Sequence, residues 1–131
     1  MQIGAHVSTA TSADRAIDRA VEIGAEAVQV FVSAPQSWGF KPLDEKVATD
    51  FKIKAREYNM GPTVFHAIYL VSLGSDDDAL IDRGKTSLKK YMNAAADLDA
   101  LGVIFHLGSH KGKGFDAVKA KVAEGIRDVL S

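Results

Sequence analysis

The sequence contains no cysteine, which excludes disulfide bonds, cysteine-ligated zinc and a thiol nucleophile. It has no long apolar run and no basic segment ahead of an apolar one at its start, so we expect neither a transmembrane helix nor a signal peptide. Neither sign of charge dominates, because 16 lysines and arginines oppose 17 aspartates and glutamates. The net charge of -1 does not predict a bulk electrostatic attraction to nucleic acid or to an anionic membrane. These absences fit a cytoplasmic protein that does not bind membranes.

The composition that is present describes an ordinary globular domain. Of the 131 residues, 47% are hydrophobic and 25% are charged, which does not fit an intrinsically disordered chain. The length indicates one domain or part of one. No low-complexity segment or linker interrupts residues 1–131.

Short apolar runs alternate with helical patterns from one end of the chain to the other. The runs that predict strands are residues 2–7, 27–32, 63–66 and 103–106. Ser12 and Asp44 are candidate N-caps of the first two helices, and Ser75 with Asp78 resembles a capping box before the third. The residues expected to end these helices are Gly24, Gly61 and Gly102. A fourth helix is marked by Phe115, Val118, Val122 and Val129.

This alternation predicts an α/β fold with parallel strands covered by helices. Two architectures fit it. One is a small doubly wound sheet, and the other is four βα units of a TIM (β/α)₈-type barrel, which typically needs about 250 residues. Residues 5–10, at the end of the first predicted strand, lack the glycines of a dinucleotide-binding loop. This makes a doubly wound sheet that binds a dinucleotide less favoured.

Three of the four histidines fall at the carboxyl end of a predicted strand. These are His6, His66 and His106, and His110 follows in the loop after the fourth strand. Ligands of α/β folds bind at this end of the strands. A single such histidine is more often a packed, hydrogen-bonded residue, but three at equivalent positions favour a metal site, with zinc a common choice for imidazole ligands.

The loops after the strands carry other candidate binding residues. Tyr69 lies three residues after His66, where a tyrosine at the mouth of the site would stand. Gly108 and Ser109 can offer backbone N–H groups and a hydroxyl to an anion. Trp38 could stack on a base, although a lone tryptophan is more often a packing residue.

Four segments together resemble endonuclease IV, the family-2 apurinic/apyrimidinic endonuclease, and more widely the xylose-isomerase-like barrels. In family order they are residues 3–8, 31–38, 66–70 and 106–110. The resemblance implies a barrel that holds zinc ions and hydrolyses the DNA phosphodiester 5′ to abasic sites in base excision repair. It implies that His66 and His106 are metal ligands, and that Tyr69 is the residue that probes the DNA at the lesion. It places His6 on the floor of the site, as a residue that is not a ligand. The further positions expected at the DNA are Gln36, Trp38, Ser109 and His110.

The sequence departs from the family pattern at several of these positions. Family residues that contact DNA, an asparagine and an arginine, align with Ala34 and Gln36, and a later asparagine aligns with Ser72. The family's bridging glutamate follows its fifth strand and its other ligands come later still. We therefore expect these 131 residues to supply only the first two ligands, as an N-terminal half-barrel.

The function predicted from the sequence is accordingly that of a zinc-dependent endonuclease IV acting on DNA with abasic sites, of which this chain carries one half. One alternative is a half-barrel that binds or supports a partner without catalysis. Another is a sugar isomerase or epimerase of the same superfamily. A half-barrel would expose strand edges and apolar side chains, so we also expect pairing with a second copy or with a second half-barrel chain.

Overall fold

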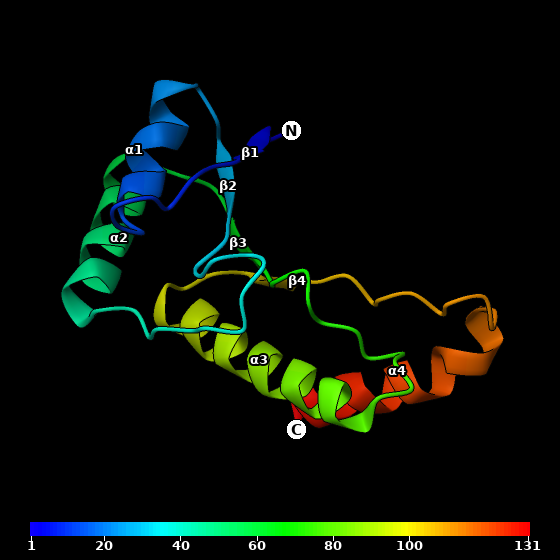
Figure 1. The fold of residues 1–131 in the computed structure, drawn as a ribbon. Helices are drawn as coiled ribbons and strands as arrows, with labels where there is room; N and C mark the ends of the chain where they lie inside the picture. The colour runs from blue at the N-terminus through cyan, green and yellow to red at the C-terminus, as the bar shows by residue number, and fades with distance from the viewer.

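The computed structural model describes all 131 residues as four strands alternating with four helices (Figure 1). The strands are β1 (Gly4–His6), β2 (Ala27–Val30), β3 (Thr63–His66) and β4 (Gly102–Ile104), and the helices are α1 (Arg15–Glu22), α2 (Glu45–Glu57), α3 (Asp78–Asp97) and α4 (Phe115–Leu130). All neighbouring strands are parallel, and their order in the sheet is β1-β2-β3-β4. A doubly wound sheet would reverse this order at a switch point. The prediction of four consecutive βα units of a TIM-type barrel is therefore confirmed.

The two faces of the sheet differ sharply in burial. Val28 pairs with Thr63 and Val30 with Phe65, and all four side chains are buried on one face. This face packs against the helices through a core that includes Ile17, Phe51 and Tyr91. The opposite face, called the open face below, carries side chains that are all partly or fully exposed: His6, Gln29, Val64, His66 and Ile104.

Both edges of the sheet are unpaired, because β1 pairs only with β2 and β4 only with β3. Large apolar side chains lie exposed beside the β4 edge: Leu101 is 77% exposed and Ile104 is 47% exposed. Unpaired strand edges next to exposed apolar side chains favour association with another strand.

Several residues that were predicted to cap the helices or to face the core do so in the structure. Asp44 caps α2, and its carboxylate accepts hydrogen bonds from the backbone N–H groups of Lys46 and Val47. One stripe of α3 is buried throughout, as the helical spacing predicts: Gly84, Leu88, Tyr91, Ala95 and Leu98. Gly24 adopts a φ of 72° one residue after the C-cap of α1, which is the position where glycine ends helices most readily.

Other predicted helix boundaries are wrong. The cap of α1 is Asp14, and the Ser12 hydroxyl bonds to the Asp14 carboxylate instead of to a backbone N–H group. The cap of α3 is Asp77, whose carboxylate accepts from Ala79 and Leu80, while the Ser75 hydroxyl accepts from the Asp77 N–H. At α3 two oxygens two residues apart compete for the cap, and the sequence does not rank them. At α1 no side chain makes a cap bond.

The ends of the strands also differ from the sequence prediction. The first, second and fourth strands are shorter than expected, because residues beyond them turn into the loops without a ladder partner. Gly102 does not end α3, which finishes at Asp97, but starts β4. Phe115 begins α4 yet is 62% exposed, so it does not belong to the core that its spacing suggested.

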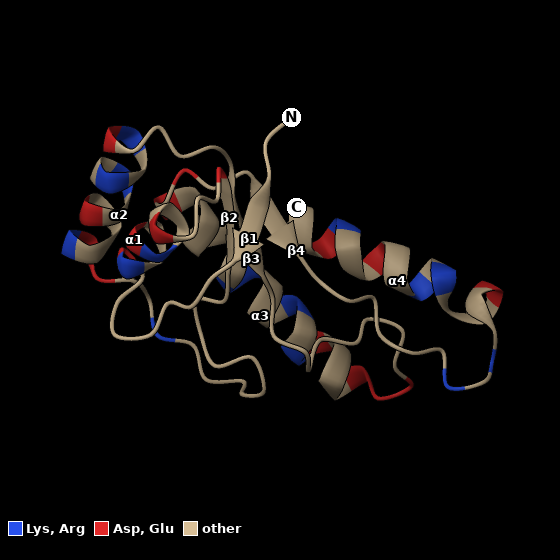
Figure 2. Ribbon diagram, turned by 90° about the horizontal axis from the view of Figure 1, so that it is seen from above, with Lys and Arg blue, Asp and Glu red and all other residues tan.

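Charged side chains are confined to the helices and loops. Figure 2 shows lysine, arginine, aspartate and glutamate distributed over the helices, whereas the strands carry none. None of the helices is both long enough and apolar enough to span a bilayer.

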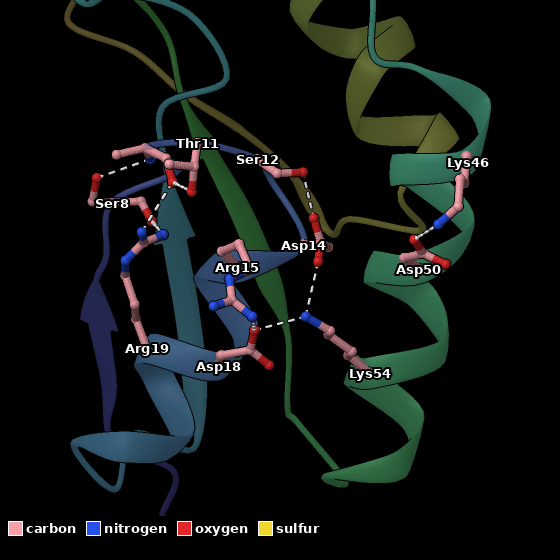
Figure 3. Close-up of polar contacts among 11 residues, drawn as sticks. Ser8, Thr11, Ser12, Asp14, Arg15, Asp18, Arg19, Lys46, Asp50 and Lys54 are labelled. Atoms are coloured by element: carbon pink, nitrogen blue, oxygen red, sulfur yellow. Dashed lines mark hydrogen bonds and ion pairs between the residues drawn. The ribbon is translucent and has the colours of Figure 1, made fainter.

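A cluster of ion pairs around Lys54 joins α1 to α2, and Arg15 also pairs with Asp18 at 3.0 Å (Figure 3). The Lys54 ammonium lies 2.8 Å from the Asp14 carboxylate and 2.6 Å from that of Asp18. All three side chains are less than one-third exposed. Burial alone would raise the pKa of Asp14, but hydrogen bonds from Lys54 and Ser12 outweigh it, and this pKa is lowered.

We expect Lys54→Met to destabilise the fold by about 1–2 kcal/mol, because it leaves the Asp14 carboxylate without a cation and Asp18 with only the exposed Arg15. Since the pKa of Asp14 is lower in the folded state, its contribution is complete above about pH 4 and is lost as the pH falls through the folded-state pKa. The variant should therefore lose less stability in acid than the wild type. Urea unfolding at neutral and acidic pH measures both effects.

The control is Lys46→Met. Lys46 pairs with Asp50 on the surface of α2, and its side chain is 81% exposed. This pair should contribute little to stability. Equal losses for the two variants would contradict the role assigned to the Lys54 cluster.

Candidate functional site

The strand-end histidines gather on the open face. His6 ends β1, His66 ends β3, and His106 lies two residues after β4. The ring centroids of His66 and His106 lie 5.1 Å apart, and those of His6 and His66 lie 6.2 Å apart. Parallel pairing places the ends of successive strands side by side, which explains why residues far apart in the chain meet. The predicted convergence of these three side chains is observed.

Phe31 lies at the centre of this group, and the sequence reasoning did not single it out. Its ring centroid is 4.7 Å from His6, 4.9 Å from His66 and 5.4 Å from Tyr69. The signal was available, because Phe31 follows β2 at the position equivalent to the other strand-end residues. Its apolar ring lies against both His6 and His66, so one side of the site is aromatic.

The His66 ring is held by its own backbone neighbourhood. Its Nδ1 lies 2.7 Å from the carbonyl oxygen of Ala67. A carbonyl oxygen can only accept, so Nδ1 is the donor, and in the neutral imidazole this leaves the lone pair on Nε2. This is the arrangement in which a histidine is oriented for a metal by a bond from its other nitrogen.

His6 differs from His66 in its electrostatic setting. Desolvation by burial lowers its pKa first, and the neighbouring His66, when charged, lowers it further. His6 is therefore biased toward the neutral form.

Tyr69 stands at the mouth of the group. Its side chain is 52% exposed, and its ring centroid lies 5.6 Å from that of His66 and 5.9 Å from that of His106. The Tyr69 backbone N–H donates to the carbonyl oxygen of Pro35 at 2.8 Å, which ties the loop after β3 to the loop after β2. A hydrogen bond thus holds the Tyr69 backbone, while its side chain remains exposed.

The other predicted site residues lie further out. Gln36 is exposed in the loop after β2, and Trp38 packs on the core with the guanidinium carbon of Arg83 4.7 Å from its ring centroid. Ser109 accepts a hydrogen bond from the Lys111 N–H. The His110 Nδ1 accepts from the N–H groups of Gly112 and Gly114, so this ring holds the loop that leads into α4 and does not join the histidine group. The structure therefore brings together only His6, His66, His106 and Tyr69 of the predicted set.

The donor set is small. No three or more histidine, aspartate or glutamate side chains are grouped closely enough to hold a metal ion. Two imidazoles on adjacent strands fit the ligand chemistry of zinc, but a catalytic zinc normally has three protein ligands. Within this chain the group can therefore supply part of a metal site.

Comparison with known proteins shows the family. Residues 17–131 match the family model described as a xylose isomerase-like TIM barrel. The chain belongs to this family. Its resemblance to endonuclease IV is confirmed by curated relatives, since it is 34% identical over 130 residues to the "Probable endonuclease 4" of Halothermothrix orenii and 33% identical over 132 residues to that of Persephonella marina. These alignments cover 99% and 100% of this chain but 47% and 46% of the relatives.

Solved structures share this fold. The crystal structure of endonuclease IV from Thermus thermophilus superposes with a TM-score of 0.89 at 29% identity, covering 99% of this chain and 46% of that one. D-psicose 3-epimerase from Clostridium cellulolyticum reaches a TM-score of 0.70 at 13% identity, which shows the shared fold alone. The chain spans about half the length of the relatives it matches, and its sheet is half of a TIM barrel.

Proposed function

We propose that residues 1–131 form one (β/α)₄ portion of an endonuclease IV that hydrolyses DNA at abasic sites with zinc. In this proposal His66 and His106 hold one zinc ion, and Tyr69 meets the DNA at the lesion. Gln36, Trp38, Ser109 and His110 lie beside the DNA path, and His6 forms the floor. A cytoplasmic location belongs to the same proposal.

The observation that carries the proposal is the pairing of His66 with His106. Their rings are 5.1 Å apart on the open face, and the Ala67 carbonyl leaves Nε2 of His66 available. When bound, zinc would supply Lewis-acid polarisation of the phosphodiester and activation of water. The chain's own residues would orient the ion and the DNA. The remaining ligands would have to come from the other half of a barrel.

The endonuclease proposal is favoured over the two alternatives. The epimerases share the fold at 13–18% identity, whereas proteins named endonuclease 4 are 32–36% identical to this chain. A non-catalytic binding module does not need a tyrosine held at its backbone and exposed beside two histidines. Such a tyrosine is suited to placing its aromatic ring in the gap that a missing base leaves in a DNA duplex.

Tyr69→Ala is expected to weaken binding to a duplex with one abasic site by roughly tenfold, because a base-stacking aromatic contributes about 1–3 kcal/mol. Binding to the intact duplex should change little. Fluorescence anisotropy with both duplexes at low salt measures this, since weak DNA binding falls steeply with salt.

Tyr58→Ala is the matched control. Tyr58 follows α2 and is 53% exposed, close to the 52% of Tyr69, but lies outside the histidine group. It should leave both affinities unchanged. A wild-type chain that binds the two duplexes equally, or an unaltered preference in Tyr69→Ala, would overturn the DNA part of the proposal.

A further inference from the structure

The loop after β4 approaches the loop after β3 at one glycine. Gly108 has a φ of 92°, and a Cβ atom built on it would lie 2.9 Å from Cα and 3.0 Å from Cβ of Ser72. Real Cβ atoms essentially never come within 3.0 Å of a backbone atom, so the two loops can touch here only through glycine. In Figure 1 these loops leave neighbouring strands, as the segments after β3 and β4.

This contact lies just beyond the candidate metal ligands. The last bond between the two strand ends joins the Ala67 N–H to the Ile104 carbonyl oxygen at 2.8 Å. Residues 105–109 make no backbone hydrogen bond to another element. His106 therefore sits between two fixed points, the Ala67–Ile104 bond before it and the Gly108–Ser72 contact after it.

We propose that Gly108 is a positioning residue that keeps the His106 ring beside His66 by letting its loop press on Ser72. For metal binding, this role rests on the proposed function. A methyl group at position 108 would push the two loops apart by a few tenths of an ångström or more. Zinc–imidazole bonds tolerate only about 0.2 Å, so this displacement would separate the two ligands.

Gly112 provides a matched control in the same loop. Its φ of 85° is as unfavourable for alanine as that of Gly108, but a Cβ atom there meets nothing within 4 Å. Gly112→Ala therefore introduces equal backbone strain without the collision. A difference between the two alanine variants reports the contact with Ser72 and not the strain.

The experiment uses the 131-residue chain and two readouts. The first is the nuclear Overhauser effect between the imidazole protons of His66 and His106, which needs no metal. We expect it in the wild type and in Gly112→Ala, and we expect its loss in Gly108→Ala. The second is zinc affinity by competition with a chromophoric chelator, which should fall about tenfold or more in Gly108→Ala and stay within about twofold in Gly112→Ala.

A double variant tests the collision itself. Ser72→Gly removes the Ser72 hydroxyl and Cβ, so Gly108→Ala/Ser72→Gly should regain part of both signals. An undiminished Overhauser effect in Gly108→Ala would overturn the proposal. So would a Gly108→Ala chain that is unfolded by circular dichroism beside a folded Gly112→Ala, since the glycine would then serve the whole fold. A wild type that binds no zinc would refute the proposed function, while the Overhauser comparison would still decide the role of Gly108.

Discussion

Sedimentation of the purified 131-residue chain is expected to show dimers or larger species at micromolar concentration. The open face carries partly or fully exposed side chains, and β1 and β4 each have one unpaired edge. A second half-barrel, from another copy or another chain, could pair with both edges because all strands are parallel. Two such sets of four strands would make the eight of a closed barrel.

Ile104→Lys should shift this equilibrium strongly toward the monomer. Ile104 pairs in register with His66 on the open face and is 47% exposed, so a charge there would oppose burial in an interface. The control is Ile53→Lys on α2, where the side chain is 46% exposed but remote from the sheet edges. It should leave association unchanged. A wild type that sediments as a stable monomer would contradict the prediction.

The second large effect concerns catalysis. With added zinc, the 131-residue chain is expected to nick abasic DNA at no more than background rate, although relatives of about twice its length carry the name endonuclease 4. The reason is the ligand count, since no three metal-binding side chains are grouped in this chain. A gel assay on a duplex with one abasic site measures the rate.

The double variant His66→Ala/His106→Ala is the control for this assay. Any nicking that persists in the double variant comes from another source. Strong nicking by the wild type that disappears in the double variant would show that two histidines suffice. That result would overturn the claim that these residues form only part of the catalytic site.

The strands and the convergence of the histidines were predictable because they depend on burial and on parallel pairing. Thr63–His66 is a short apolar run that becomes β3 with the predicted bounds. Once four such strands are parallel and consecutive, the residues that follow their carboxyl ends, His6, His66 and His106 among them, must lie at the same end of the sheet. These features follow from a pattern of apolar residues, which the sequence shows directly.

The features that the sequence did not predict depend on competition between neighbouring groups. Ser75 and Asp77 each offer an oxygen near the start of α3, and the local geometry selects Asp77. The contact of Phe31 with both His6 and His66 depends on how the strands are staggered. The hydrogen bonds of His110 require a loop that turns back through Gly112 and Gly114. A one-dimensional pattern contains none of this geometry.

A zinc titration of the dialysed chain by isothermal calorimetry tests whether His66 and His106 together hold one metal ion. We expect at most one weakly bound zinc per chain, lost in His66→Ala and in His106→Ala alike. Binding should be unchanged in His110→Ala, because that ring is engaged by Gly112 and Gly114 in the loop before α4. Zinc binding that survives the loss of both His66 and His106 would show that the two histidines do not form the metal site.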